Sequence, residues 1–323
     1  MDVADTATMT GEPLDHALIR ARLSQAGGSV GVPLVYLPVA GSTNDVASEM
    51  ARTGASHGTT VVADAQTAGR GRRGKGPWQS PPGGSIAMSV ILRLQLVTPK
   101  RLGRIAIAVA VAVGDAITSA TGLVTAVKWP NDIVTCAIGD LGTVRKLGGI
   151  LIEPALGNDP DGTPVMRHAI VGIGINANVP VSRFEMMDRA SLAPASLSGE
   201  LGGPVSREAL IVDLLWALDS VGPMCSETGW IETTRRYEAR LAWRKWPVVV
   251  AFPVEGSSTV RRPIAGELVG IDGSGALTVL DHSGTLHVVH DGDVRVRTAD
   301  LDQGVHFPVN PCRGFRDFPI DRH

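Results

Sequence analysis

The chain has 323 residues, 44% of them hydrophobic, which is enough for one large domain and a small one beside it. Its 30 Lys and Arg against 32 Asp and Glu give a formal net charge of −2, which excludes bulk attraction to nucleic acid or to a membrane surface. The three cysteines are scattered and form no Cys-x-x-Cys pair, a usage typical of the reducing cytoplasm. We expect no signal peptide and no membrane span, because the most apolar run, residues 105–114, is about half as long as a spanning helix.

The first half of the chain alternates between strand and helix patterns. One helix is expected in "PLDHALIRARLSQAG" within an N-terminal extension, which is too short for a helix-turn-helix domain of roughly 60 residues. Ser42 or Thr43 is a candidate N-cap for a helix whose apolar face is Val46, Ala47, Met50 and Ala51, with Gly54 as its stop. The expected strands are 32–40, 58–69 and 83–96, and an apolar helix is expected over 99–121.

The second half begins with sheet strands and two helices and ends in short strands separated by turns. Residues 125–135 read as a strand broken by a Pro-Asn-Asp turn, and "KLGGILIEP" and "RHAIVGIGINANV" as adjacent strands. Two helices are expected, over 206–221 with Ser206 as its cap and over about 230–242. After Trp246, short strands separated by Gly, Asp and Ser predict a small all-β barrel of about fifty residues.

The stretch "GRGRRGKGPW" (69–78) gathers positive charge on a flexible backbone. It fits the dinucleotide spelling G-x-G-x-x-G, but no helix can follow Gly74 in "KGPWQSPPGG", so the Rossmann interpretation fails. Glycine lets a backbone fold over a ligand, and arginine offers planar charged forks for phosphate oxygens. The loop therefore favours a nucleotide whose reaction occurs at a phosphate, with a solvated basic loop or an RNA-binding segment as the alternatives.

Three other stretches carry polar residues in aimed positions. "VKWPNDI" places Lys128, Asn131 and Asp132 around a turn fixed by Pro130, "KLGGILIE" puts Lys146 at the start of an apolar strand, and "VGIGINAN" ends on Asn176. Each has an ordinary structural explanation: a good turn, a lysine that snorkels to solvent, and a strand-end cap.

Taken together, these stretches resemble the catalytic domain of biotin protein ligases. The resemblance rests on "GSTN" (41–44), "QTAGRGRRG" (66–74), "KWPND" (128–132), "KLGGILIE" (146–153) and "GIGIN" (172–176), which occur in the family's order. It implies an α+β fold, a mixed β-sheet flanked by helices like that of class II aminoacyl-tRNA synthetases, with a small C-terminal SH3-like β-barrel. The expected division is an extension (1–33), a catalytic domain (34–245), an SH3-like domain (246–297) and a tail (298–323). In a departure from the family's spacing, Gly76 and Pro77 separate Lys75 from Trp78, which bears on how Trp78 meets adenine.

The resemblance implies two steps of chemistry. The carboxylate of biotin attacks the α-phosphorus of ATP, with Mg²⁺ bridging phosphates, and a lysine of a biotin carboxyl carrier domain then attacks the biotinyl-5′-AMP. Lys146 and Arg72 are the implied catalytic residues. The implied biotin-binding residues are Ser42, Thr43, Asn44, Gln66, Gly69, Arg70, Gly71, Arg72, Lys146, Gly148 and Gly149, with strand residues as far as Leu151 lining the slot. The implied ATP-binding residues are Arg72, Arg73, Lys75, Trp78, Lys128, Asn131, Asp132, Lys146 and Asn176.

Several points stay open at the level of sequence. Asp132 either holds Mg²⁺ or braces its turn, and bracing is favoured because one carboxylate makes a poor metal site. His282, His287 and His290 with Asp291 and Asp293 sit on turn-rich strands and are interpreted as solvated side chains rather than a zinc site, so no protein metal site is expected. Residues 135–145 look like an inserted surface hairpin.

The implied partners are carrier domains of acyl-CoA carboxylases and pyruvate carboxylase, with no nucleic acid and no membrane. We expect a monomer or weak homodimer in the cytoplasm. The rival functions are a lipoate-protein ligase, which the arginine-rich loop and "KWPND" disfavour, a ligand-sensing repressor, and an RNA-binding module. No repressor function is expected, since a helix-turn-helix domain does not fit the extension.

Overall fold

A computed structural model describes residues 12–72, 78, 80–94, 98–135, 144–184, 192–252 and 262–296. Arg73, Lys75, the Gly76-Pro77 departure, most of the expected hairpin at 135–145 and the tail from 298 lie outside these residues. The helices are α1 (His16–Ala26), α2 (Thr43–Arg52), α3 (Leu102–Thr121), α4 (Val181–Phe184), α5 (Leu197–Leu201), α6 (Arg207–Asp219), α7 (Val221–Cys225) and α8 (Glu227–Arg240). The strands are β1 (Leu34–Ala40), β2 (Thr60–Gln66), β3 (Ser85–Leu92), β4 (Thr125–Lys128), β5 (Asp132–Thr135), β6 (Lys146–Asn158), β7 (Pro164–Asn176), β8 (Pro247–Ala251), β9 (Ile264–Ile271), β10 (Leu277–Leu280), β11 (Leu286–Val289) and β12 (Asp293–Val296).

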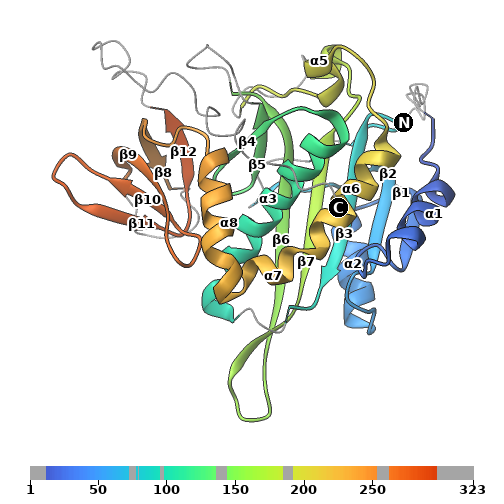
Figure 1. Cartoon of the computed structure of the whole chain (residues 1–323), viewed down its shortest axis with the longest axis horizontal. Helices are drawn as coiled ribbons and strands as arrows, with labels where there is room; N and C mark the ends of the chain where they lie inside the picture. Colours follow the sequence, from blue (N-terminus) through green and yellow to red (C-terminus); the bar gives the residue numbers. More distant parts are fainter. Residues whose placement is uncertain are drawn as a thin grey trace, which may run out of the picture.

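A seven-stranded mixed sheet is the centre of the molecule, with strand order β1-β2-β3-β7-β6-β5-β4. β1 and β2 run parallel, because α2 connects them, and every other neighbouring pair is antiparallel. β6 is longer than predicted, and β7 begins and ends three residues earlier than predicted; the two continue past the other strands as a two-stranded ribbon (Figure 1). The α+β prediction is confirmed.

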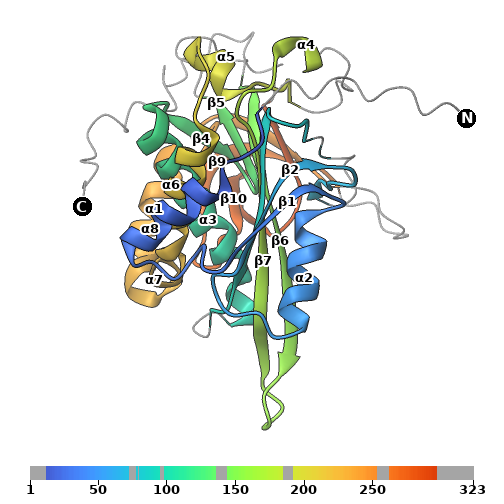
Figure 2. The ribbon, with the colours of Figure 1, turned by 90° about the vertical axis from the view of Figure 1, so that its right-hand side faces the viewer.

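The helices cover the two faces of this sheet unequally. α1, α3, α6, α7 and α8 lie on one face and α2 alone lies on the other (Figure 2). α3 is apolar nearly all round because it packs between the sheet and the outer helices, and residues 107–113 are at most 1% exposed. By length and composition it is the one helix among the described residues that would cross a membrane, but 67% of its most apolar window is buried inside the protein.

The ends of the helices follow from their sequences, with one exception. Ser206 accepts from the backbone N–H of Ala209, as predicted for the cap of α6. Ser42 stands at the N-cap of α2 but makes no capping hydrogen bond, so the expected cap is wrong in its contacts. Helix α2 packs on the sheet through Ala47 and Ala51, the apolar face that the sequence indicates. The first backbone amides of α2 are thereby left for other partners.

The small sheet is antiparallel with order β11-β10-β9-β8-β12, and it packs beside the start of α3. Trp129 donates from Nε1 to the carbonyl of Gly275, at 3.2 Å, and Arg104 donates to the carbonyl of Gly273, at 2.9 Å. A Cβ on Gly103 would lie 2.4 Å from the Ser274 carbonyl oxygen, so the chains approach closely there. These contacts fix the turn between β9 and β10 against the large domain.

Candidate active site

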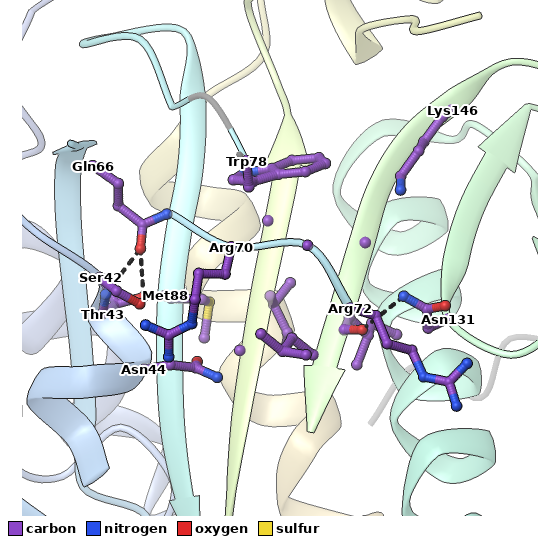
Figure 3. A pocket seen from close by; sticks show the side chains of 17 residues that line it. Ser42, Thr43, Asn44, Gln66, Arg70, Arg72, Trp78, Met88, Asn131 and Lys146 are labelled. Atoms are coloured by element: carbon purple, nitrogen blue, oxygen red, sulfur yellow. Dashed lines mark hydrogen bonds between the residues drawn. The ribbon is translucent and has the colours of Figure 1, made fainter. Parts of the chain in front are cut away.

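A pocket opens over the centre of the large sheet, where α2, β6 and β7 meet the basic segment (Figure 3). Figure 3 shows the amide and hydroxyl side chains of Ser42, Thr43, Asn44 and Gln66 at one end with Arg70 beside them, Lys146 and Arg72 at the other end, and Trp78 between. Most of the predicted site residues are brought together here. The lining residues are Ser42, Thr43, Asn44, Gln66, Arg70, Gly71, Arg72, Trp78, Met88, Asn131, Lys146, Gly149, Ile150, Leu151, Gly172, Ile173 and Gly174.

The uncharged end is built around the N-terminus of α2. The backbone N–H of Thr43 donates to Gln66 Oε1 at 2.8 Å, and its hydroxyl reaches the same oxygen at 3.2 Å. The amide nitrogen of Gln66 reaches Ser80 Oγ at 3.3 Å. The Gln66 side chain therefore takes the place of the missing cap, and its amide is oriented from both ends.

Arg70 anchors the beginning of the basic segment to the same helix. Its guanidinium makes two hydrogen bonds of 2.6 Å to the carboxylate of Asp45 and lies 3.3 Å from Glu153 Oε1. The hydrogen bonds from Arg70 hold the pKa of Asp45 below its ordinary value, and the same contact raises the pKa of Arg70. Asp45 therefore anchors the start of the basic segment next to the pocket.

Glycines form the floor of the pocket, and the indole of Trp78 lies on them. A Cβ on Gly174 would stand 2.5 Å from two atoms of the Trp78 ring, and one on Gly149 would stand 3.9 Å from it. The Lys146 ammonium lies 5.6 Å from the Trp78 ring centroid, a cation–π contact. Trp78 Nε1 is buried with no hydrogen-bond partner in the described part of the chain. The sequence indicates contact with adenine, whereas the indole here covers the glycine floor.

The cations at the other end are paired with carboxylates from both sheets. Lys146 Nζ lies 2.7 Å from Asp132 Oδ1, and Lys128 Nζ lies 2.6 Å from Asp293 Oδ1 and 4.0 Å from Asp132. Arg72 lies 3.3 Å from Asp291 Oδ1. Asp132 therefore holds two lysines. The interpretation of Asp291 and Asp293 as solvated side chains is wrong, because both bind cations of the site, and both side chains are only 23% exposed.

Five predicted residues lie behind the lining. Gly69 accepts from the backbone N–H of Trp78 at 2.8 Å, which closes the loop, and a Cβ on Gly148 would lie 2.6 Å from the Gly174 carbonyl oxygen. Asn176 donates to the carbonyl of Ala195 at 3.0 Å, so it braces a neighbouring segment. Lys128 and Asp132 complete the set through the ion pairs above. Arg73 and Lys75 lie outside the described residues.

Sequence reasoning missed several residues of this site. Met88, Gly172 and Ile173 line the pocket from β3 and β7, and the alternation of these strands was the available signal. Ser89 and Glu153 contact lining residues without lining the pocket themselves. Nothing local marks them, because their partners are 45 and 109 residues away. Among the described residues, no group of three or more His, Cys, Asp or Glu is placed to hold a metal ion.

Known proteins resemble this chain in sequence and in fold. The family profile described as "Biotin/lipoate A/B protein ligase family" matches residues 36–176. The bifunctional ligase/repressor BirA of Bacillus subtilis is 32% identical over 279 residues, which are 85% of this chain and 75% of that protein. The biotin--[acetyl-CoA-carboxylase] ligase of Paracoccus denitrificans is 31% identical over 248 residues, 75% of this chain and 92% of that protein.

The structural comparison agrees at the level of fold. The biotin protein ligase of Aquifex aeolicus, solved in complex with biotin and ATP, superposes with a TM-score of 0.62 at 23% identity and covers 82% of this chain and 98% of its own. The chain therefore belongs to the biotin/lipoate A/B protein ligase family, in its biotin protein ligase branch, and is an enzyme of the ligase class.

Proposed function

We propose that this protein joins biotin to ATP, giving biotinyl-5′-AMP and pyrophosphate, and then transfers biotin to a lysine of a carrier domain, releasing AMP. The observation that carries the proposal is the polarity of the pocket. Amide and hydroxyl groups of Thr43 and Gln66 stand at one end, and Lys146 and Arg72 stand at the other. The names of the relatives and the biotin and ATP bound by the Aquifex aeolicus protein agree with it.

Biotin fits this polarity in one direction. Its ureido ring, with two N–H donors and a carbonyl, would meet Thr43 and Gln66, while its sulfur ring and chain would lie in the slot between Met88 and Trp78. Its carboxylate would then point to Lys146. The other assignments made from the resemblance are proposed on the same basis: Ser42, Asn44, Gly69, Arg70, Gly71, Gly148 and Gly149 toward biotin, and Arg73, Lys75, Trp78, Asn131 and Asn176 toward ATP.

The first step needs positive charge more than it needs a base. The biotin carboxylate is already ionised at neutral pH, and it must approach an anionic α-phosphate. Lys146 and Arg72 would neutralise both groups as the carboxylate oxygen forms its bond to phosphorus and the pyrophosphate oxygen leaves. Lys128 would take the outer phosphates, exchanging Asp293 for a phosphate oxygen.

In the second step a carrier lysine attacks the carbonyl carbon of the mixed anhydride. The new amide bond forms, the bond to the AMP oxygen breaks, and the ammonium proton is released to solvent. The same cations would stabilise the departing AMP, so one charge cluster serves both steps. We propose carrier domains of acyl-CoA carboxylases and pyruvate carboxylase as substrates, and a monomer or weak homodimer acting in the cytoplasm without nucleic acid.

Magnesium would enter with the nucleotide. Mg²⁺ binds substrate phosphates and keeps several of its waters, so the nucleotide would supply most of its ligands, while Asp132 stays paired with Lys128 and Lys146. When bound, the ion would supply charge neutralisation at the phosphates. We also propose the division of the chain at residues 33, 245 and 297, which places the two sheets in separate domains.

Exchange of labelled pyrophosphate into ATP tests the first step. Purified protein with Mg²⁺ would be assayed with biotin, with lipoate and with neither acid. We expect exchange that depends on biotin. Exchange with lipoate alone would leave the fold and the adenylation chemistry in place and change the substrate. No exchange with either acid, in a folded protein, would reject the proposal. Mass spectrometry of a carrier domain would then report the transfer step as one added biotin on one lysine.

A further inference from the structure

Ser89 on β3 is a buried hydroxyl beside the pocket that the proposed chemistry does not use. It is 0% exposed and does not line the pocket. Its Oγ lies 2.8 Å from Thr43 Oγ1 and 2.6 Å from Asn44 Oδ1, both of which belong to lining residues. A buried hydroxyl costs stability unless it is hydrogen-bonded, so these two contacts hold Ser89 and its partners in one arrangement.

Asn44 is fixed on its other sides as well. Its Nδ2 donates to Glu153 Oε2 at 2.7 Å, and a carboxylate only accepts, so the amide nitrogen must face Glu153 and the amide oxygen must face Ser89. A Cβ on Gly172 would lie 2.2 Å from Asn44 Oδ1, which shows that the amide lies directly on β7. Three elements therefore determine one side chain at the uncharged end of the pocket.

The contacts form one continuous polar chain. It begins at Gln66, which accepts from Thr43, and continues through Ser89 and Asn44 to Glu153. Glu153 is held in turn by Arg70, at 3.3 Å. Thr43, Asn44 and Gln66 line the pocket (Figure 3), whereas Ser89 and Glu153 do not line it. The two residues outside the pocket thus set the orientation of those inside it.

We propose that Ser89 is a positioning residue for recognition of the biotin ureido ring, acting through Thr43 and Asn44, and that Glu153 closes the same chain at its far end. The inference rests on the proposed function, because it assigns the uncharged end of the pocket to the ureido ring. A planar ring with fixed N–H and carbonyl positions is recognised only if the protein groups are already aimed, since each rotor that must be ordered on binding lowers affinity. The cation end of the pocket is outside this chain, so ATP binding does not depend on it.

The chain offers a matched control for the test. Ser85 lies four residues earlier on the same face of β3 and is also 0% exposed, but its hydroxyl has no hydrogen-bond partner among the described residues. Ser89→Ala and Ser85→Ala therefore remove the same atom from equally buried positions. Calorimetry would give the Kd for biotin and for dethiobiotin, which keeps the ureido ring, and pyrophosphate exchange would give the KM for ATP.

We expect Ser89→Ala to raise the Kd for biotin and for dethiobiotin by the same factor, about tenfold, from the loss of a buried hydrogen bond. Ser85→Ala should leave both values within about twofold, and neither variant should move the KM for ATP by more than about twofold. A Ser89→Ala variant that matches Ser85→Ala in biotin affinity would overturn the inference. So would a parallel rise in the KM for ATP, which would indicate general distortion of the pocket.

Glu153→Gln is the second variant, and it protects the test if Ser89→Ala does not fold. The Glu153 side chain is 40% exposed, so its replacement leaves the core intact. Glutamine keeps the shape but loses the charge that orients the Asn44 amide, and we expect the Kd for biotin to rise about threefold to tenfold. Unchanged affinity would reject the role of Glu153 and, with Ser89→Ala unfolded, the proposal. A wild-type protein that binds no biotin would instead reject the proposed function.

Discussion

Lys146 and Lys128 share a carboxylate, although they enter the site from different strands. Asp132 lies 2.7 Å from Lys146 and 4.0 Å from Lys128, and Asp293 completes the neutralisation of Lys128. These ion pairs reduce the electrostatic cost of placing several cations close together when no ligand is bound. Phosphate and carboxylate oxygens of the substrates would then replace oxygens that the protein already supplies.

Among the cations of the site, Lys146 is the one whose removal should slow the first step most. We expect Lys146→Ala to lower kcat/KM for biotin-dependent pyrophosphate exchange by about 100-fold or more, since it removes charge from the site where two anions meet. Circular dichroism and the thermal midpoint should stay close to those of the wild type. Arg235→Ala, on the exposed side of α8 and paired with Glu232, is the control and should leave exchange unchanged. Turnover of Lys146→Ala within twofold of the wild type would remove it from the mechanism.

Residues with local motifs were the ones that the sequence could predict. Gln66, Arg72 and Lys146 occur in stretches whose spelling and order indicate their place, and all three line the pocket. The carboxylates could not be predicted in the same way. Asp293 pairs with a lysine 165 residues earlier, and a turn rich in Gly and Asp looks the same whether it faces solvent or a cation.

At the scale of elements, β6 and β7 supply the floor of the pocket because glycine interrupts two apolar strands. Gly149 and Gly174 leave room for the Trp78 indole, and Gly172 leaves room for the Asn44 amide, directly on the backbone. Strand periodicity predicted both strands, and the length of the apolar stretch predicted α3, which is buried as expected. The short helices α4, α5 and α7 were not predicted, because four or five residues carry no readable period.

A methyl group on the strand floor tests this arrangement. In Gly174→Ala the new Cβ would lie 2.5 Å from the Trp78 ring, so the indole must move and the slot must narrow. We expect the KM for biotin to rise about tenfold while the free energy of unfolding, measured with denaturant, falls by only about 1–2 kcal/mol. Gly203→Ala is the control, because no heavy atom lies within 4 Å of its added Cβ. If both variants bind biotin like the wild type, Gly174 is not part of the ligand slot.

At the scale of the whole molecule, the small sheet is part of the site and not an appendage. Hydrogen bonds from Trp129 and Arg104 fix it to the large domain. Asp291 and Asp293, at its last strand β12, form ion pairs with Arg72 and Lys128. The sequence predicted the small β domain from its turn spacing. It did not predict the docking, because contacts between distant segments leave no local pattern.

Asp293→Asn tests whether the small sheet neutralises a cation of the site. The Lys128 side chain is only 10% exposed, so loss of its nearer carboxylate should lower the free energy of unfolding by about 1–3 kcal/mol. Mg·ATP should restore more stability to the variant than it adds to the wild type, because phosphate oxygens replace the missing charge. Thermal unfolding with and without Mg·ATP measures the difference.

Glu267→Gln, an exposed change on β9 of the same sheet, is the control for this experiment and should behave like the wild type. An equal thermal shift with Mg·ATP in Asp293→Asn and in the wild type would mean that Asp293 and the nucleotide do not use the same cation.

Asp291 and Asp293 follow their partners, Arg72 and Lys128, by more than 160 residues in the sequence, so the ribosome adds them later. A chain that has left the ribosome as far as residue 252 holds the whole pocket lining but lacks the carboxylates that accompany Arg72 and Lys128. Synthesis runs from the N-terminus, and domains generally fold in that order. Lys128 therefore gains its partner Asp293 only after β12 has been synthesised. The carboxylates that accompany Arg72 and Lys128 are therefore synthesised after all of the residues that line the pocket.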